Sequence, residues 1–288
     1  MVTRQITTRR VNFEYDDSNL PQHFAGGDLV MSHVVAMLSA MFPNGEDFFV
    51  ASVRNYRDRI TEPELKRQVG RFIGQEAIHG REHRVLNERL HAMGYTTRFV
   101  DRAVDVGLNR FATRLLPKSI QLAITAALEH YTATLAELLL LRPEARDMLD
   151  GEVRNLLLWH ALEEAEHKAV AFDVYQAVCG NGWRGHLIRT LTMDVVTALF
   201  LFAIVDTTRR SMRRDPAARD RARRRESLGR LRHSPFLTRA VRSRIGDYNR
   251  RDFHPDDHQT DELLAEWRDR LFGADGALRH RLAAPVPA

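Results

Sequence analysis

The sequence predicts an all-α protein: a four-helix bundle with additional C-terminal helices. Apolar residues recur at helical spacing through most of the 288 residues, and Pro and Gly mark the ends of the helical segments. Glutamates and histidines also follow a fixed order, in which two helices carry one Glu each and two carry a Glu-x-x-His pair. Bundles that hold a carboxylate-bridged pair of metal ions use this order.

The N-terminal half divides at its turn residues. Residues 1–27 form an irregular arm that is expected to pack on the bundle. We expect a helix from about 28 to 41, an interruption at 42–45 because Pro43 and Gly45 oppose helix continuation, and a new helix capped by Asn44 with Glu46 in its first turn. The next helix begins at a capping box over residues 61–64 and ends before Gly94.

The later helices are predicted in the same way. A connecting helix covers residues 97–115, and a further helix runs from about 117 to 141 and is closed by Pro143. The fourth ligand-bearing helix begins after Gly151 and continues to residues 180–182. The predicted organisation is an arm (1–27), a metal-binding bundle (28–182), an Arg-rich helical extension (183–275) and a tail (276–288).

The candidate metal ligands come from four of these helices. Residues at i and i+3 lie on one helical face, so both members of each Glu-x-x-His pair can point at one pair of metal ions. Four Glu carboxylates cancel the charge of two divalent cations, which a buried site requires. The ligands in chain order are Glu46, Glu76, His79, Glu129, Glu164 and His167.

His160 precedes Glu164 by four residues and is either a seventh ligand or a histidine that supports a ligand. His83 has the same relation to His79, and we expect it to support a ligand. Glu163 competes with Glu164, but its direction on the helix places it at the surface or behind the ligands. The pair Glu88 and His91 repeats the Glu-x-x-His spacing at the end of its helix, where a solvated surface pair is expected.

Composition bounds the class of protein. The hydrophobic content of 44% suits a globular chain, and a single cysteine excludes a disulfide framework. A signal peptide is not evident, which predicts a cytoplasmic protein. Residues 207–288 hold 20 arginines against 12 acidic residues, so the whole net charge of +5 comes from the C-terminal third.

An apolar run at 195–205 precedes an Arg-rich stretch at Arg209–Arg232, and its 11 residues are too short to span about 30 Å of hydrocarbon. The Arg-rich stretch is either a solvated or subunit-contacting helix, or a patch that contacts an anionic membrane surface. Nucleic acid is not expected as a partner, because aromatic residues are not interleaved with the arginines. A homo-oligomer remains open.

Four segments resemble a known bacterial family. They are SAMFPNGEDFF at 39–49, FIGQEAIHGREH at 72–83, ALEHYTA at 127–133 and WHALEEAEHKAVAFD at 159–173. These segments resemble the family named "predicted metal-dependent hydrolase", over roughly residues 5–272. The ligand pattern is also similar to that of ferritin-like di-iron oxygenases of the p-aminobenzoate N-oxygenase type. That similarity implies a ferritin-like bundle and adds His160 to the metal ligands.

The favoured function is therefore a dinuclear metal enzyme, with iron expected and manganese or zinc as alternatives, that uses O2 to oxidise an apolar small substrate. The alternative is metal-dependent hydrolysis of an ester, amide or phosphate by a metal-bound water. A third reading is not enzymatic and assigns the bundle to iron storage or to a lipid-associated structural role. Beyond the metal ligands, the sequence predicts no separate catalytic residue.

Overall fold

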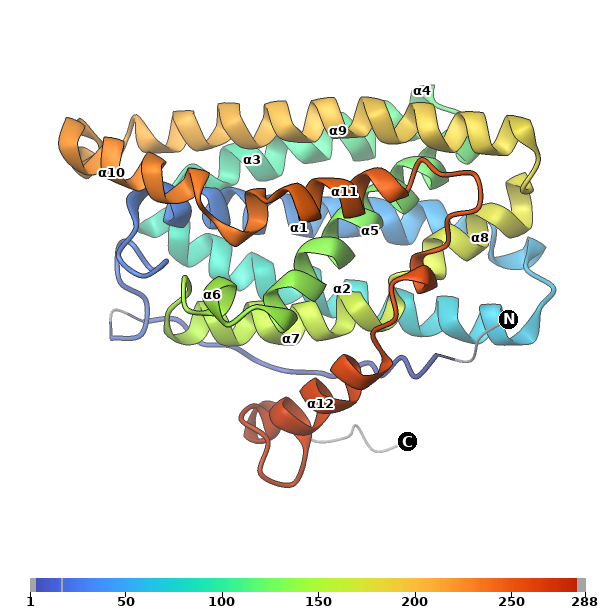
Figure 1. The fold of residues 1–288 in the computed structure, drawn as a ribbon, viewed down its shortest axis with the longest axis horizontal. Helices are drawn as coiled ribbons and strands as arrows, with labels where there is room; N and C mark the ends of the chain where they lie inside the picture. Colours follow the sequence, from blue (N-terminus) through green and yellow to red (C-terminus); the bar gives the residue numbers. More distant parts are fainter. Residues whose placement is uncertain (1–3, 17, 284–288) are drawn as a thin grey trace.

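The computed structural model describes residues 4–16 and 18–283, and this part of the chain is helical without strands (Figure 1). Val11 and Leu282 form a single isolated antiparallel bridge. Four long helices make the centre, with α1 packed along α2 and α5 along α7. Their bounds are α1 (Leu29–Arg54), α2 (Pro63–Ala92), α5 (Lys118–Leu141) and α7 (Gly151–His167). The predicted all-α bundle is thus confirmed.

Shorter elements connect and cover this centre. The helices are α3 (Thr97–Val104), α4 (Thr113–Leu115), α6 (Pro143–Arg146), α8 (Val170–Cys179), α9 (Trp183–Met212), α10 (Arg221–Arg232), α11 (Arg239–Asp247) and α12 (Asp261–Phe272). A π-helical segment, η2 (Asp105–Ala112), joins α3 to α4, so the predicted connecting helix over 97–115 is confirmed as one helical run. The 3-10 turns are η1 (Arg57–Arg59), η3 (Pro216–Arg219), η4 (Pro235–Leu237), η5 (Pro255–Asp257) and η6 (Arg279–Arg281).

The prediction that α1 would break at residues 42–45 is wrong. Pro43 lies inside one continuous helix, although it has no N–H to donate to the carbonyl oxygen of Ser39. The Asn87 side chain on α2 supplies the missing donor, with its Nδ2 at 2.9 Å from that oxygen. A bundle partner therefore replaces the hydrogen bond that the sequence alone shows as lost.

The fourth ligand-bearing helix is also different from the prediction, because it breaks after His167 into α7 and α8. Lys168 and Ala169 form a turn at the break. The buried Lys168 ammonium donates to Glu137 Oε1 on α5 at 2.8 Å and to Thr260 Oγ1 at 3.0 Å. These contacts hold the chain at the break, and no Pro or Gly marks it in the sequence. The predicted capping box also differs: the N-cap of α2 is Glu62, whose carboxylate accepts from the Leu65 N–H.

The apolar core is divided by a polar layer across the bundle. One cluster includes Met37, Leu86 and Trp159, and the other includes Phe48 and Phe72. Along α2, Glu76 lies between Phe72 of one cluster and Ile78 of the other. The candidate ligands therefore lie deep in the bundle, with hydrophobic packing on both sides.

The N-terminal arm and the C-terminal helices wrap this bundle. The arm buries Ile6, Phe13 and Phe24, which agrees with the predicted packing. Helix α9 covers α1 and α5, while α12 contacts α7 and lies at the edge opposite α9 (Figure 1). The division of the chain into four segments at residues 27, 182 and 275 remains a prediction.

Helix α9 is longer than its apolar run. It has 30 residues and is long and apolar enough to cross a membrane by length and composition, with 22% of its most apolar 18-residue window buried inside the molecule. The expectation that this segment is too short to span is therefore wrong. Core helices pass the same test, so it does not by itself assign a membrane location.

Candidate metal centre

The structure brings all seven predicted residues together inside the bundle. Helix α1 places Glu46, α2 places Glu76 and His79, α5 places Glu129, and α7 places His160, Glu164 and His167. None of the seven is more than 3% exposed. Helical spacing aims each set inward, as residues three, four and seven apart share one face.

Their ligand atoms form two separate groups and a third group, Glu76, His79 and Glu164, that overlaps both. Glu46, His79 and His160 offer atoms within 4.8 Å of one another, and so do Glu76, Glu129 and His167. Glu164 lies between the two groups. Its Oε1 is 2.8 Å from His160 Nε2 and 3.6 Å from His79 Nδ1, and its Oε2 is 3.6 Å from His167 Nε2.

The polar atoms of this cluster fit a cation, because many have no other partner. Both carboxylate oxygens of Glu46, Glu76 and Glu129 are buried without a hydrogen bond in the described structure, as are Glu164 Oε2, His79 Nδ1 and His167 Nε2. Buried polar groups are normally hydrogen-bonded, and an unpaired one costs about 1–3 kcal/mol. These unpaired atoms converge on one region, and bound cations there would give them partners.

The pKa values of the carboxyl groups reflect the same lack of compensating positive charge. Burial, followed by repulsion from Glu164 and Glu129, holds the pKa of Glu46 and of Glu76 well above its usual value. Burial and Glu164 raise the pKa of Glu129 to about 7. Burial also opposes ionisation of Glu164, but His167 and His160 outweigh it and lower that pKa. Four neighbouring carboxylates can all be ionised only where cations compensate them.

Outer hydrogen bonds fix which nitrogen of each histidine faces the cluster. His79 directs Nε2 to Glu163 Oε2 at 3.1 Å, and His167 directs Nδ1 to Gln75 Oε1 at 2.8 Å. In these tautomers His79 donates through Nε2 and His167 donates through Nδ1. The second nitrogen of each ring, His79 Nδ1 and His167 Nε2, is then free to bind a metal ion. Arg9 of the arm holds Glu163 in turn, at 3.1 Å.

His160 is oriented by a chain of hydrogen bonds that ends at the Pro43 gap. Its Nδ1 lies 2.7 Å from His83 Nε2, and His83 Nδ1 lies 2.8 Å from Ser39 Oγ. Ser39 Oγ donates to Asn87 Oδ1 at 2.7 Å. One consistent assignment lets His160 donate through Nδ1 and keep Nε2 toward Glu164. His83 thus lies behind His160, as the sequence predicts.

Other glutamates and histidines near the predicted ligands in the sequence lie elsewhere or take other roles. Glu88 is exposed and pairs with Arg98, as a solvated surface pair should. His130 turns away and bonds the Arg244 carbonyl at 3.0 Å. Glu163 is fully buried against His79, so the surface alternative for it is wrong.

Sequence reasoning missed Gln75, Arg9 and Ser39. Gln75 could have been found, because it lies one turn from His79 and directly before Glu76 on a buried helix. Arg9 lies in an irregular arm, and no pattern in the sequence points to it.

A cavity of about 780 Å³ reaches the cluster from one side. Helices α1, α5, α7 and α9 line it almost entirely with aliphatic and aromatic side chains. Glu46, His160 and Glu164 lie on its wall, so this space connects the candidate centre with the surface. Tyr131 also lines it and donates its hydroxyl to Thr197 at 2.7 Å.

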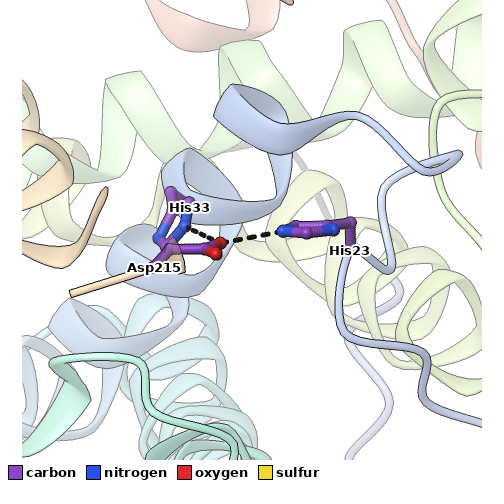
Figure 2. A group of neighbouring side chains, drawn as sticks. All are labelled: His23, His33 and Asp215. Carbon is purple, nitrogen blue, oxygen red and sulfur yellow. Dashed lines mark hydrogen bonds and ion pairs between the residues drawn. The ribbon is translucent and has the colours of Figure 1, made fainter. Parts of the chain in front are cut away.

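A second group of metal-binding residue types, His23, His33 and Asp215, lies away from this cluster (Figure 2). Both histidines direct Nε2 to Asp215 Oδ2, at 2.8 and 3.0 Å. Their other nitrogens contact Arg223 and Ser211 at 2.9 and 2.8 Å. Every ring nitrogen has a partner, and a metal on His23 would turn an N–H toward the Arg223 guanidinium. We interpret this group as a polar clasp that joins the arm, α1 and the end of α9.

The bundle and its buried carboxylate–histidine cluster define the chain as a metal-dependent helical protein. A family model described as "Predicted metal-dependent hydrolase" matches residues 7–259, and the chain belongs to that family. The family resemblance of the sequence is thereby confirmed. Neither the curated proteins nor the solved structures gave a significant match to the chain.

Proposed function

We propose that this chain is an enzyme with a dinuclear metal centre that oxidises an apolar small molecule with O2. Two ions are supported by the two ligand groups that share no residue, Glu46–His79–His160 and Glu76–Glu129–His167. Glu164 offers one oxygen to each group and is suited to bridge them. Carboxylate and imidazole ligands without thiolate suit iron, and they also accept manganese or zinc.

The observation that carries the choice of chemistry is the cavity wall. Its titratable residues in the described structure are Glu46, His160 and Glu164, which are candidate ligands, and Tyr131, whose hydroxyl is already donated to Thr197. Hydrolysis of an ester or amide needs water and a proton donor for the leaving group. An apolar wall without a free acid or base disfavours that reaction and suits the oxidation of an apolar substrate.

Metal-dependent hydrolysis is the second candidate, and the description of the family favours it over oxidation. A bound pair of iron ions would supply electrons to O2, whereas zinc or manganese would supply Lewis acidity. In either case the roles of the protein side chains are the same. Gln75, Glu163 and His83 orient the histidines, and the apolar cavity binds the substrate and limits access of water.

Anaerobic loading with Fe(II), followed by metal analysis and measurement of O2 uptake, tests the proposal. We expect about two irons per chain and O2 uptake that Glu76→Gln abolishes. Glu88→Gln, which changes the surface Glu-x-x-His pair of the same helix, is the matched control and should retain both. Tight zinc or manganese binding with ester or amide cleavage and no O2 uptake would instead establish the hydrolytic alternative.

A further inference from the structure

Helix α9 presents an apolar stripe to solvent along most of its length. The stripe residues, each at least 45% exposed, are Leu187, Leu191, Val195, Leu199, Phe202 and Val205. Their spacing of three or four residues places them on one side of the helix. They cover 18 residue steps, or about 27 Å at 1.5 Å per residue. A contiguous apolar surface of this kind marks an interaction site.

The opposite side of α9 is held to the molecule. Arg189, Met193 and Val196 are buried there, and α9 packs on α1 and α5. The Arg189 guanidinium donates to the Arg250 carbonyl at 2.8 Å and also to the Tyr248 carbonyl. If α9 crossed a membrane, it would have to leave the bundle and these contacts would break. We therefore consider partners that bind the stripe while α9 stays packed on the bundle.

Arginines flank the stripe at both ends. Arg184 precedes it, and Arg209 and Arg213 continue its spacing after Val205. Arg209 and Arg213 are exposed and make no ion pair within the described part of the chain. Of the acidic groups near the stripe, Asp206 pairs with Arg210 at 2.6 Å, whereas the exposed Asp194 accepts from the neutral Asn249 amide at 2.9 Å. The charge of Asp194 is outnumbered by the three flanking arginines.

This charge pattern selects among partners. A second copy of the chain packed stripe to stripe would bring arginines against arginines, whether the two helices ran parallel or antiparallel. An anionic phospholipid surface accepts the apolar stripe between its headgroups and attracts the arginines at both ends. We propose that α9 docks flat on an anionic membrane surface through this stripe.

The same residues connect the docking face to the cavity. Leu191, Val195 and Leu199 are exposed and also line the cavity, as does the exposed Leu116 at the end of η2 and α4. A molecule with a long hydrocarbon chain can pass from the bilayer into the cavity without crossing water. This route, together with the function proposed above on which the inference rests, assigns the substrate to compounds with a long hydrocarbon chain.

Vesicle co-sedimentation tests the docking. The full chain should sediment with vesicles of phosphatidylglycerol and phosphatidylcholine, and much less with phosphatidylcholine alone or at high salt. Leu191→Ser with Phe202→Ser should lower the partition coefficient about a hundredfold. Arg209→Gln with Arg213→Gln should lower it about thirtyfold. Each double variant changes exposed side chains, so its melting temperature should match that of the wild type.

Matched controls are Leu141→Ser, an exposed leucine on α5, and Arg57→Gln with Arg154→Gln, exposed arginines outside α9. These should bind vesicles as the wild type does. Equal binding by the α9 variants, or no binding to anionic vesicles, would overturn the proposal. So would a dimer in solution that Leu191→Ser with Phe202→Ser dissociates, or attachment that neither salt nor alkaline carbonate releases.

A fluorescent fatty acid titrated into metal-free protein tests the substrate class separately. We expect it to bind, and Ala203→Phe on the cavity wall should weaken binding at least tenfold while leaving vesicle binding unchanged. Absence of fatty-acid binding would overturn the assigned substrate class alone. Because neither assay needs metal or turnover, failure of the O2 reaction would not affect either result.

Discussion

At the scale of single residues, the site depends on which atoms are left without partners. The carboxylate oxygens of Glu46 and Glu76 are buried without a hydrogen bond, although His167 Nε2 lies 3.1 Å from Glu76 Oε1. Glu163, one position before Glu164, instead accepts from His79 and Arg9. Two adjacent glutamates on one helix thus have different roles. Burial raises the pKa of Glu163 to about 8, and Arg9 opposes that shift, so the arm helps to keep its carboxylate able to accept from His79.

Gly80 allows the close approach of Glu46, which yields a residue-scale prediction. A Cβ at Gly80 would lie 3.2 Å from Glu46 Oε2 and 3.7 Å from Pro43 Cα. Gly80→Ala should displace the Glu46 carboxylate and weaken metal binding about tenfold, by about 1.4 kcal/mol. Metal titration monitored by calorimetry measures the effect.

Gly70→Ala is the control for that substitution. Gly70 lies on the same helix, and a Cβ at this position would meet no heavy atom within 4 Å. Its replacement should stabilise α2 by up to about 1 kcal/mol and leave metal affinity unchanged. Equal affinity in Gly80→Ala and Gly70→Ala would mean that Glu46 does not need this space.

At the scale of elements, neighbouring helices decide where α1 and α7 end. The continuity of α1 through Pro43 depends on Asn87 of α2, and the break after α7 is held by Glu137 of α5 through Lys168. Both pairs of partners are far apart in the chain. The single helix α1 then carries both Ser39, which supports His83, and Glu46, so its continuity fixes their relative positions.

A double-mutant cycle tests the replacement hydrogen bond. Asn87→Ala should destabilise the protein by about 1–3 kcal/mol, because the Ser39 carbonyl is left unpaired. In a Pro43→Ala background the restored N–H of residue 43 can bond that carbonyl, so the cost of Asn87→Ala should fall. Urea unfolding of the four proteins measures the coupling, and additive effects would contradict this account.

The clasp of His23, His33 and Asp215 predicts a pH dependence of stability. Burial lowers the pKa of His33 below its usual 6.5, so the folded state resists its protonation more than the unfolded state does. This contribution is complete above pH 6.5 and is lost as the pH falls below it, by at most about 1.4 kcal/mol per pH unit.

Unfolding by urea at neutral pH and at about pH 5.5 measures that loss. The His33→Gln variant lacks the titrating group and should lose less stability on acidification than the wild type. Metal content must be equal in both proteins at each pH. A larger acid sensitivity in His33→Gln would show that the ion pair with Asp215, and not burial, dominates at this histidine.

At the scale of the whole molecule, we expect metal binding and folding to be coupled. The polar layer of candidate ligands lies between two apolar clusters, and its carboxylates have raised pKa values without cations. The arm and C-terminal helices close around this layer. Without a metal, these carboxyl groups would either be ionised without a compensating charge or have to take up protons, and both are unfavourable.

Chelation should lower the melting temperature accordingly. A ligand at a thousandfold excess over its dissociation constant stabilises the folded state by about 4 kcal/mol, which corresponds to about 7 °C for a chain of this size. Thermal melts with and without a chelator measure the shift, and added metal should reverse it. Glu88→Gln should behave as the wild type, while a melt that does not respond to chelator would show that the centre is not coupled to stability.

Much of this arrangement follows from local patterns. Helical periodicity and the Glu-x-x-His spacing predict the bundle, the four ligand helices and six of the clustered residues, because these signals lie within a turn or two of one helix. The family similarity adds His160 as the seventh. The local signals for helix ends predict the wrong ends near Pro43 and Lys168. There the course of the chain depends on Asn87 and Glu137, which lie on other helices. The sequence does not predict the clasp or the support from Arg9 for the same reason, because their partners lie in distant segments of the chain.

The linear order of residues thus carries the class of the fold, the candidate ligands and the family, since each depends on residue type and short-range spacing. Packing decides the tautomers of the histidines, the role of Glu163, the apolar cavity and the exposed stripe of α9. Those properties depend on which side chains from distant segments meet and which faces remain uncovered. Helical spacing alone cannot distinguish a stripe that packs on α1 and α5 from one that faces outward.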